Sequence, residues 1–251
     1  IASRSATPRR GILFIAGLQF AGALLGGTAV AFTLSSLLAF DAGPAAVPVL
    51  LTALLGAIAW NLLTWRYALP SSSTHALIGG LVGAGVAYGG PAGIFWGVAE
   101  FLAPPHELAG LLKILVFLAV SLAVGLLGGF ALHRTAALLL RNARRGVVRE
   151  IARSNWIAAG FMAFFNGAND GGKLLGIVLL GLGASGTWAG TGQPLWARLG
   201  IALLITLGTV GGGWRIMATL GRRIFKIEPL HSFSSQFSSG ASIALSTLAG
   251  A

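Results

Sequence analysis

The segment GANDGGK at positions 167–173 places two ionisable side chains, Asp170 and Lys173, between long apolar runs. Ionisable residues in such surroundings are costly to desolvate and by default mark a functional site. The Asp170 carboxylate and the Asn169 carbonyl are oxygen ligands that suit Na⁺, and the carboxylate can also hold a proton. The structural alternative is an Asp170 N-cap at a membrane surface, with Lys173 extending outward to water.

The glycines of this segment predict a local break in a membrane helix. Irregular backbone at membrane depth is tolerated only where it lines a cavity or is buried in protein. The helix that starts after the break would offer free N–H groups, with Asn169 and Asp170 as caps, and its dipole would attract an anion. In this arrangement Lys173 either guides the anion or pairs with Asp170.

A second segment, PSSSTH at positions 70–75, clusters hydroxyl groups. Pro70 suits the first turn of a helix, because that position needs no N–H donor. The hydroxyls of residues 71–74, together with backbone N–H groups, could surround a tetrahedral oxyanion and release it more readily than a charged clamp would. The alternative is an ordinary Ser-rich helix start, with His75 as a hydrogen-bonded polar residue.

The elements that must position these segments are membrane helices. Of 251 residues, 55% are hydrophobic and 9% are charged, with a mean hydropathy of +0.84, whereas soluble domains carry roughly 25% charged residues. Apolar runs recur without the alternation of a β-barrel, and they predict roughly six to eight membrane segments, some of half length. The runs are Gly11–Phe40, Val47–Leu63, Leu111–Leu132, Trp156–Leu182 and Leu199–Leu220.

The net charge of +11 comes from basic residues that flank these runs. By the positive-inside rule, three basic loops are expected to be cytoplasmic in a multi-pass protein of the plasma (inner) membrane, and nucleic acid is not expected as a partner. The chain has no cysteine, which excludes disulfides and thiolate metal sites. The basic residues are Arg4, Arg9, Arg10, Arg141, Arg144, Arg145, Arg149, Arg153, Arg222, Arg223 and Lys226.

The chain also contains an internal repeat with an offset of 186 residues. Residues Pro8–Leu34 and Pro194–Leu220 share ten identities over 27 aligned positions, including the proline and a Gly-Gly pair. Repeated membrane halves are typical of secondary transporters, in which substrate binds near the midplane between the repeats.

Both chemical segments resemble one family. PSSSTHALIGGLVGAG is similar to the Pro-x-Ser-Thr-Thr-His signature of the inorganic phosphate transporter (PiT) family, and NGANDGGKLLGIV resembles its Gly-Ala-Asn-Asp motif with the trailing Lys. GALLGGTAVAFTL and GGGWRIMATLGRRIFKIEP resemble the family segments that follow the two acidic motifs. The resemblance covers nearly the whole chain. Departures from the pattern include Ser73 for Thr, Asn166 for His or Ser, and Gln236 for Glu.

The resemblance implies an all-α polytopic fold of two inverted repeats, whose broken or re-entrant helices meet at a midplane substrate site. The first repeat would span residues 1–140, a basic linker 141–153 and the second repeat 154–251. The implied activity is symport of inorganic phosphate with Na⁺ or H⁺ by alternating access, with no cofactor and no enzymatic step. The implied substrate-binding residues are Ser72, Ser73, Thr74, Asn169, Asp170 and Gly171, the last through its amide. Asn169 and Asp170 would also hold the cation, and Pro70, His75, Lys173 and Gln236 would support the site.

The repeat offset indicates that only one motif of each kind is present. The partner of Gly167 would lie at position −19 and that of Pro70 near position 256. We therefore expect the core of a longer transporter, or a homodimer whose copies complete each other's sites. Three alternatives remain: a sulfate permease of the same fold, a non-transporting scaffold, and a membrane phosphatase. The phosphatase needs a His–Asp pair and spaced Arg residues, a pattern that His106, His133 and His231 do not show.

Overall fold

The computed structural model describes residues 7–27, 29–39, 43, 46–142, 146–187, 192–212 and 227–250. In these residues the regular secondary structure is helical, apart from one isolated bridge between Leu38 and Ile94. The helices are α1 (Pro8–Leu25), α2 (Ala29–Ser35), α3 (Ala46–Arg66), α4 (Ser73–Gly89), the 3-10 turn η1 (Gly90–Gly93), α5 (Val98–Leu102), α6 (Gly110–Leu139), α7 (Val147–Ala184), α8 (Leu195–Gly212) and α10 (Pro229–Leu248). Within the described residues, the helical segments 46–66, 73–93, 110–139 and 195–212 are long and apolar enough to cross a membrane, as expected for a membrane protein.

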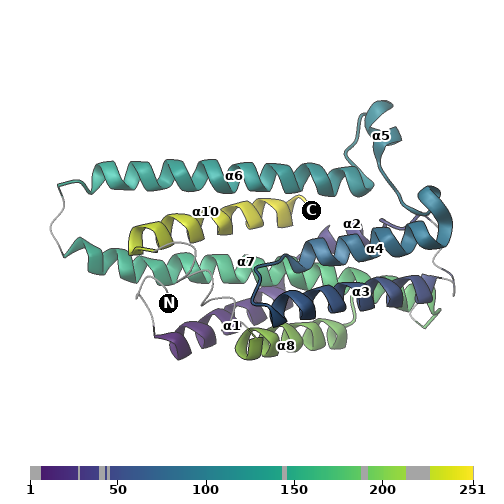
Figure 1. The fold of residues 1–251 in the computed structure, drawn as a ribbon, viewed down its shortest axis with the longest axis horizontal. Coiled ribbons are helices and arrows are strands. Elements are labelled where there is room, and N and C mark those ends of the chain that lie inside the picture. Colours follow the sequence, from purple (N-terminus) through teal and green to yellow (C-terminus); the bar gives the residue numbers. More distant parts are fainter. Residues whose placement is uncertain are drawn as a thin grey trace.

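Helix α7 forms the centre of the arrangement and packs against α1, α2, α3, α8 and α10 (Figure 1). With 38 residues it is about 57 Å long at 1.5 Å per residue. Helices α1 and α2 run parallel to it in succession, because Gly160 faces Phe14, Gly171 faces Ala23 and Gly176 faces Ala31. Helix α10 also runs parallel to α7, whereas α6 runs antiparallel to α10.

The predicted break at residues 167–173 is wrong, because α7 is continuous through this segment. The glycines serve close packing instead. A Cβ atom on Gly171 would lie 2.8 Å from the Ala23 Cα atom, and one on Gly176 would lie 2.6 Å from the Ala31 carbonyl oxygen. Neither distance is available to a real side chain, so glycine is required for the approach of α1 and α2.

A break does occur in the partner of α7, between α1 and α2 at Gly26 and Gly27. The last carbonyl groups of α1 lack intrahelical donors there. The guanidinium group of Arg198 in α8 supplies donors instead, and it bonds to the carbonyl oxygens of Leu24 at 3.0 Å and Gly26 at 3.1 Å. Its charge also suits the negative end of the α1 dipole.

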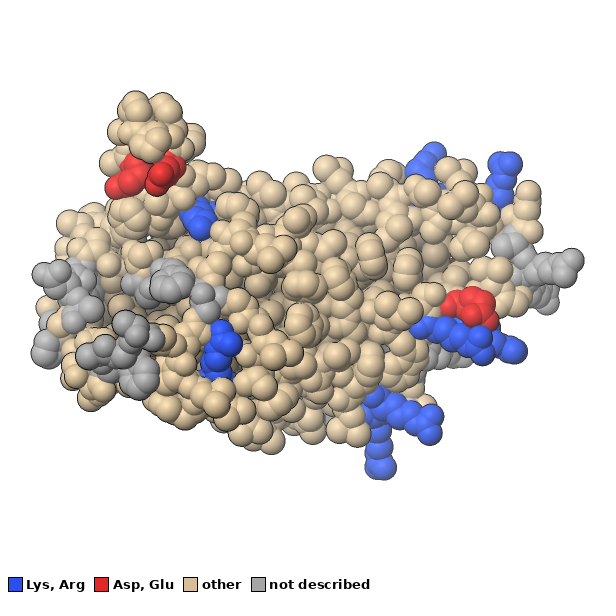
Figure 2. Space-filling model, turned by 180° about the vertical axis from the view of Figure 1, so that it is seen from behind, with Lys and Arg blue, Asp and Glu red and all other residues tan. Residues whose placement is uncertain are grey.

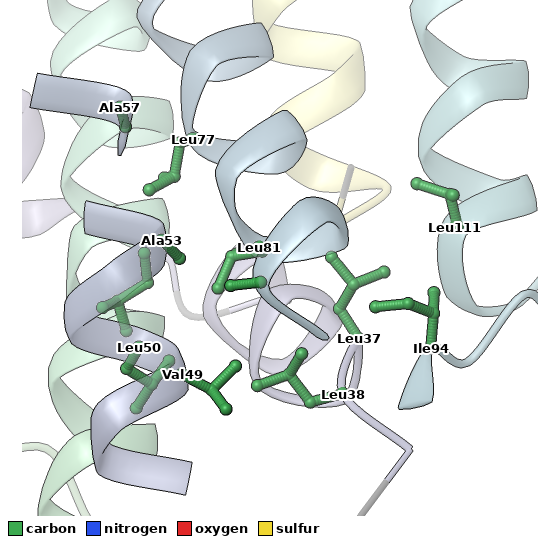
Figure 3. Packing of buried hydrophobic residues seen from close by; sticks show 12 residues of the cluster. Leu37, Leu38, Val49, Leu50, Ala53, Ala57, Leu77, Leu81, Ile94 and Leu111 are labelled. Carbon is green, nitrogen blue, oxygen red and sulfur yellow. The ribbon is translucent and has the colours of Figure 1, made fainter. Parts of the chain in front are cut away.

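The main apolar core lies between α3, α4 and the segments around residues 37–38, 94 and 111 (Figure 3). Leu37 and Leu81 are fully buried. Close contact of Gly80 with the backbone of Ala53 brings α3 and α4 together as a hairpin. Leu77, in the same core, fixes the first turns of α4 and therefore the position of the hydroxyl segment.

The described basic residues lie mostly at one end of the molecule. On the face in Figure 2 most of the blue side chains gather at the right-hand end, two further basic side chains lie on the left half, and the band between carries little charge. They belong to the start of α1, the end of α6 and the start of α7; residues 147–153 of the predicted linker are the first turns of α7. These positions fit the predicted charge asymmetry. Residues 4, 144, 145, 222, 223 and 226 lie outside the described residues.

Candidate functional site

The two chemical segments, about a hundred residues apart in sequence, meet in the fold. Lys173 of α7 donates a hydrogen bond of 2.7 Å from its Nζ atom to the Thr74 hydroxyl of α4. The same ammonium lies 3.2 Å from the Oδ1 atom of Asp170. The contacts therefore link the acidic segment and the hydroxyl segment through a single side chain.

A small pocket opens beside this contact. It is lined by Val30, Thr33, Thr74, Leu77, Ile78, Ile114 and Lys173. These residues come from α2, α4, α6 and α7, so four helices converge there. The wall that faces the cavity is apolar, and the polar groups of these residues, the two threonine hydroxyls and the Lys173 ammonium, are engaged in hydrogen bonds beside it.

The Asp170 carboxylate is engaged at both oxygens. Asn166, one helical turn earlier, donates from Nδ2 to Oδ2 at 3.1 Å, while Lys173 bonds to Oδ1. The Asp170 and Lys173 side chains are 29% and 12% exposed. This is a mostly buried ion pair. Removal of one partner would strongly destabilise the folded protein, because the other charge would stay buried without compensation. The alternative in which Lys173 extends outward to water is therefore wrong.

Asn169 points in a different direction from Asp170, because successive residues of a helix are about 100° apart. It is 7% exposed, and its Nδ2 atom donates to the Thr247 hydroxyl of α10 at 3.1 Å. The N-capping role predicted for Asn169 and Asp170 is wrong, since both lie inside α7. The amide of Gly171 also lies in the helix interior, where N–H groups bond to carbonyls four residues earlier, so its predicted use as an anion ligand is wrong.

The hydroxyls of the second segment do not form a ring. Ser72 is the N-cap of α4 and accepts the N–H of His75 at 3.3 Å, and the Ser71 hydroxyl lies 2.8 Å from the Thr64 hydroxyl. Ser73 is exposed, and Thr74 alone lines the pocket. Pro70 precedes the N-cap by two residues, so its predicted place in the first turn is wrong. His75 is exposed in the first turn.

Gln236 lies apart from the pocket. It is eleven residues before Thr247 on α10, or about 16 Å along the helix axis. Its Nε2 atom donates to the Ser232 hydroxyl, and its buried Oε1 atom has no hydrogen-bond partner among the described residues.

Sequence reasoning missed two groups at the pocket, Thr33 and Lys113. The Lys113 Nζ atom lies 3.5 Å from the Thr33 hydroxyl, which lines the pocket. Lys113 is the one cation in the apolar run 111–132, and the argument used for Asp170 would have identified it. Among the described residues, no cluster of three or more His, Asp or Glu side chains could hold a metal ion.

Comparison with known proteins shows the family to which this chain is similar. The "Phosphate transporter family" profile matches residues 1–153 and 141–251. A "Probable low-affinity inorganic phosphate transporter" of Mycobacterium bovis is 36% identical over 249 residues, which are 98% of this chain and 57% of that protein. One of the same name from Bacillus subtilis is 30% identical, over 97% of this chain and 70% of that protein. The chain thus spans little more than half of its mycobacterial relatives.

A solved structure titled "The sodium-dependent phosphate transporter" has the same fold, with a TM-score of 0.83 and 21% sequence identity over 99% of this chain and 78% of that one. The family profile covers the whole chain and includes both segments that meet at the pocket. This chain belongs to the phosphate transporter family.

Proposed function

We propose that the full-length protein is a multi-pass symporter of the plasma membrane that carries inorganic phosphate with Na⁺ or H⁺ by alternating access. Family membership and the names of its relatives support this proposal. The observation that carries it is the Lys173–Thr74 contact, because it joins two motifs that are far apart in sequence at one pocket.

The pocket offers the groups that a phosphate ion needs. The ammonium of Lys173 and the hydroxyl of Thr74 are donors suited to its oxygens, whereas the Thr33 hydroxyl already donates to the Gly250 carbonyl. The N–H groups of Ser73 and Thr74 belong to the first turn of a 17-residue helix, where they have no intrahelical acceptor and the dipole favours an anion. Asp170 supplies an acceptor for a phosphate O–H, which a sulfate ion lacks at neutral pH.

Two inverted repeats, residues 1–140 and 154–251, would provide the alternating access. The offset of 186 residues carries α1 to residues 194–211, and α8 occupies 195–212. The two helices run antiparallel, because Gln19 bonds Thr209 while Leu24 bonds Arg198. Opposite orientation of paired helices supports an inverted duplication.

The test is uptake of labelled phosphate by proteoliposomes that contain the full-length protein. Thr74→Val removes one hydroxyl donor at nearly constant shape, and the KM for phosphate should rise roughly tenfold or more, the equivalent of a hydrogen bond to a charged group. Thr52→Val is the matched control, because its hydroxyl bonds only to the Pro48 carbonyl of its own helix. An excess of sulfate should not compete. Competition by sulfate, or an equal effect of both substitutions, would contradict the proposal.

A further inference from the structure

Lys173 already supplies a positive charge in direct contact with Asp170. Its ammonium lies between the Asp170 Oδ1 atom, at 3.2 Å, and the Thr74 hydroxyl, at 2.7 Å. The other carboxylate oxygen accepts a hydrogen bond from Asn166. A sodium ion at Asp170 would therefore displace a donor and lie close to a like charge in a mostly buried site, where charges repel strongly.

The backbone of α7 itself offers no free carbonyl oxygen beside Asp170. Transporters complete Na⁺ sites with carbonyl oxygens from unwound helix segments. Helix α7 is unbroken from Val147 to Ala184, so the carbonyls near Asp170 are bonded within the helix. The side-chain amide in contact with Asp170, that of Asn166, presents its Nδ2 donor to the carboxylate, and the Asn169 amide bonds to Thr247 on another helix. A sodium ion at Asp170 would therefore find no backbone ligand on α7.

The side chains around the pocket carry a net positive charge that a single anion would neutralise. Among the described residues, the ionised side chains that line the pocket or hydrogen-bond to its lining are Lys173, Lys113 and Asp170. Two positive charges and one negative charge give a net charge of +1. A phosphate monoanion brings this sum to zero, whereas the dianion leaves it at −1.

We infer that Lys173 is the resident cation of the site. Its ammonium takes the place between Asp170 and Thr74 that a coupling sodium ion would fill, and the pocket binds the phosphate monoanion with no Na⁺ at Asp170. This inference rests on the proposed function. Lys173 provides the positive charge that a coupling sodium ion would otherwise provide. Transport of the phosphate monoanion is equivalent to transport of the dianion together with one proton.

The test combines binding of radiolabelled Na⁺ to the purified full-length protein with phosphate uptake in Na⁺ or in choline. Wild type should show no Na⁺ binding that depends on Asp170, and its uptake should be equal in both media. Lys173→Gln should gain Na⁺ binding that Asp170→Asn in the same background abolishes. Its phosphate uptake should fall by roughly tenfold or more in choline and recover in Na⁺, as expected when a buried pair loses one charge.

Lys113→Gln is the matched control, because it removes an ammonium that bonds to the pocket residue Thr33 and not to Asp170, and it should gain no Na⁺ binding. Lys173→Arg keeps the charge and should remain independent of Na⁺, which decides the question if Lys173→Gln does not fold. Asp170-dependent Na⁺ binding by wild type, or none by a folded Lys173→Gln, would overturn the inference. Absence of wild-type phosphate uptake in both media would refute the proposed function, while the Na⁺-binding arm would still decide the role of Lys173.

Discussion

Gly171→Ala tests whether the glycines of α7 serve packing or an open backbone. The new Cβ atom would lie 2.8 Å from the Cα atom and 3.0 Å from the Cβ atom of Ala23. Relaxed carbon–carbon contacts are about 3.5–4.0 Å, so α1 and α7 must separate locally by about 0.7–1.2 Å. Ala23 has no long side chain that could move aside, and overpacking of this kind costs about 1–3 kcal/mol.

The assay is thermal unfolding in detergent, followed by tryptophan fluorescence. With about 2–4 °C per kcal/mol for a chain of this size, Gly171→Ala should lower the Tm by roughly 2–12 °C. The control is Gly17→Ala in α1, where no atom lies within 4 Å of the added methyl group; its Tm should stay unchanged or rise, because alanine favours the helix. An unchanged Tm for Gly171→Ala, together with lost phosphate binding, would refute the packing argument and favour a broken helix.

Three further substitutions distinguish residues that stabilise the fold from residues that bind phosphate. Ser72→Ala removes the N-cap of α4 and should cost about 0.5–2 kcal/mol in unfolding experiments, since the His75 N–H loses its acceptor. Arg198→Lys retains the charge but lacks the planar guanidinium with which Arg198 bonds both carbonyls at the end of α1 and Gln193, so the Tm should fall with phosphate KM unchanged. Asp170→Asn leaves the Lys173 ammonium without its counter-charge, and phosphate uptake in proteoliposomes should fall by roughly tenfold or more. Full activity of Asp170→Asn would remove Asp170 from the site.

Several features of the fold and the site could be predicted from the sequence. Low charge and long apolar runs indicate membrane helices, because a hydrocarbon environment requires them. The pairing of Asp170 with Lys173 follows from a spacing of three residues on a helix, which brings side chains together. That Thr74 would join them was an expectation from family resemblance, since no local pattern specifies a contact across 99 residues.

The role of the glycines could not be predicted from composition, because glycine both weakens a helix and permits close helix packing. Their spacing does carry a signal. Gly160, Gly167 and Gly171 are seven and four residues apart, which places them on one face of a continuous helix. The partners that fill the space, among them Ala23 and Gln19, are nearly 150 residues away in sequence. Only the folded chain reveals these contacts.

The glycine contacts of α7 also determine which parts of the molecule can move independently. Backbone meets backbone where α7 touches α1 and α2, and Gly240 of α10 lies against Met162 and Phe161 of α7. Surfaces without intervening side chains have a single register, so a sliding step of one helix past another would require them to separate first. By contrast, Gly181 of α7 meets α3 only through the Leu50 side chain, at 3.9 Å. The three helices α1, α2 and α7 are therefore the part of the molecule least able to slide past one another, whereas α3 meets Gly181 of α7 through a side chain that can change its rotamer.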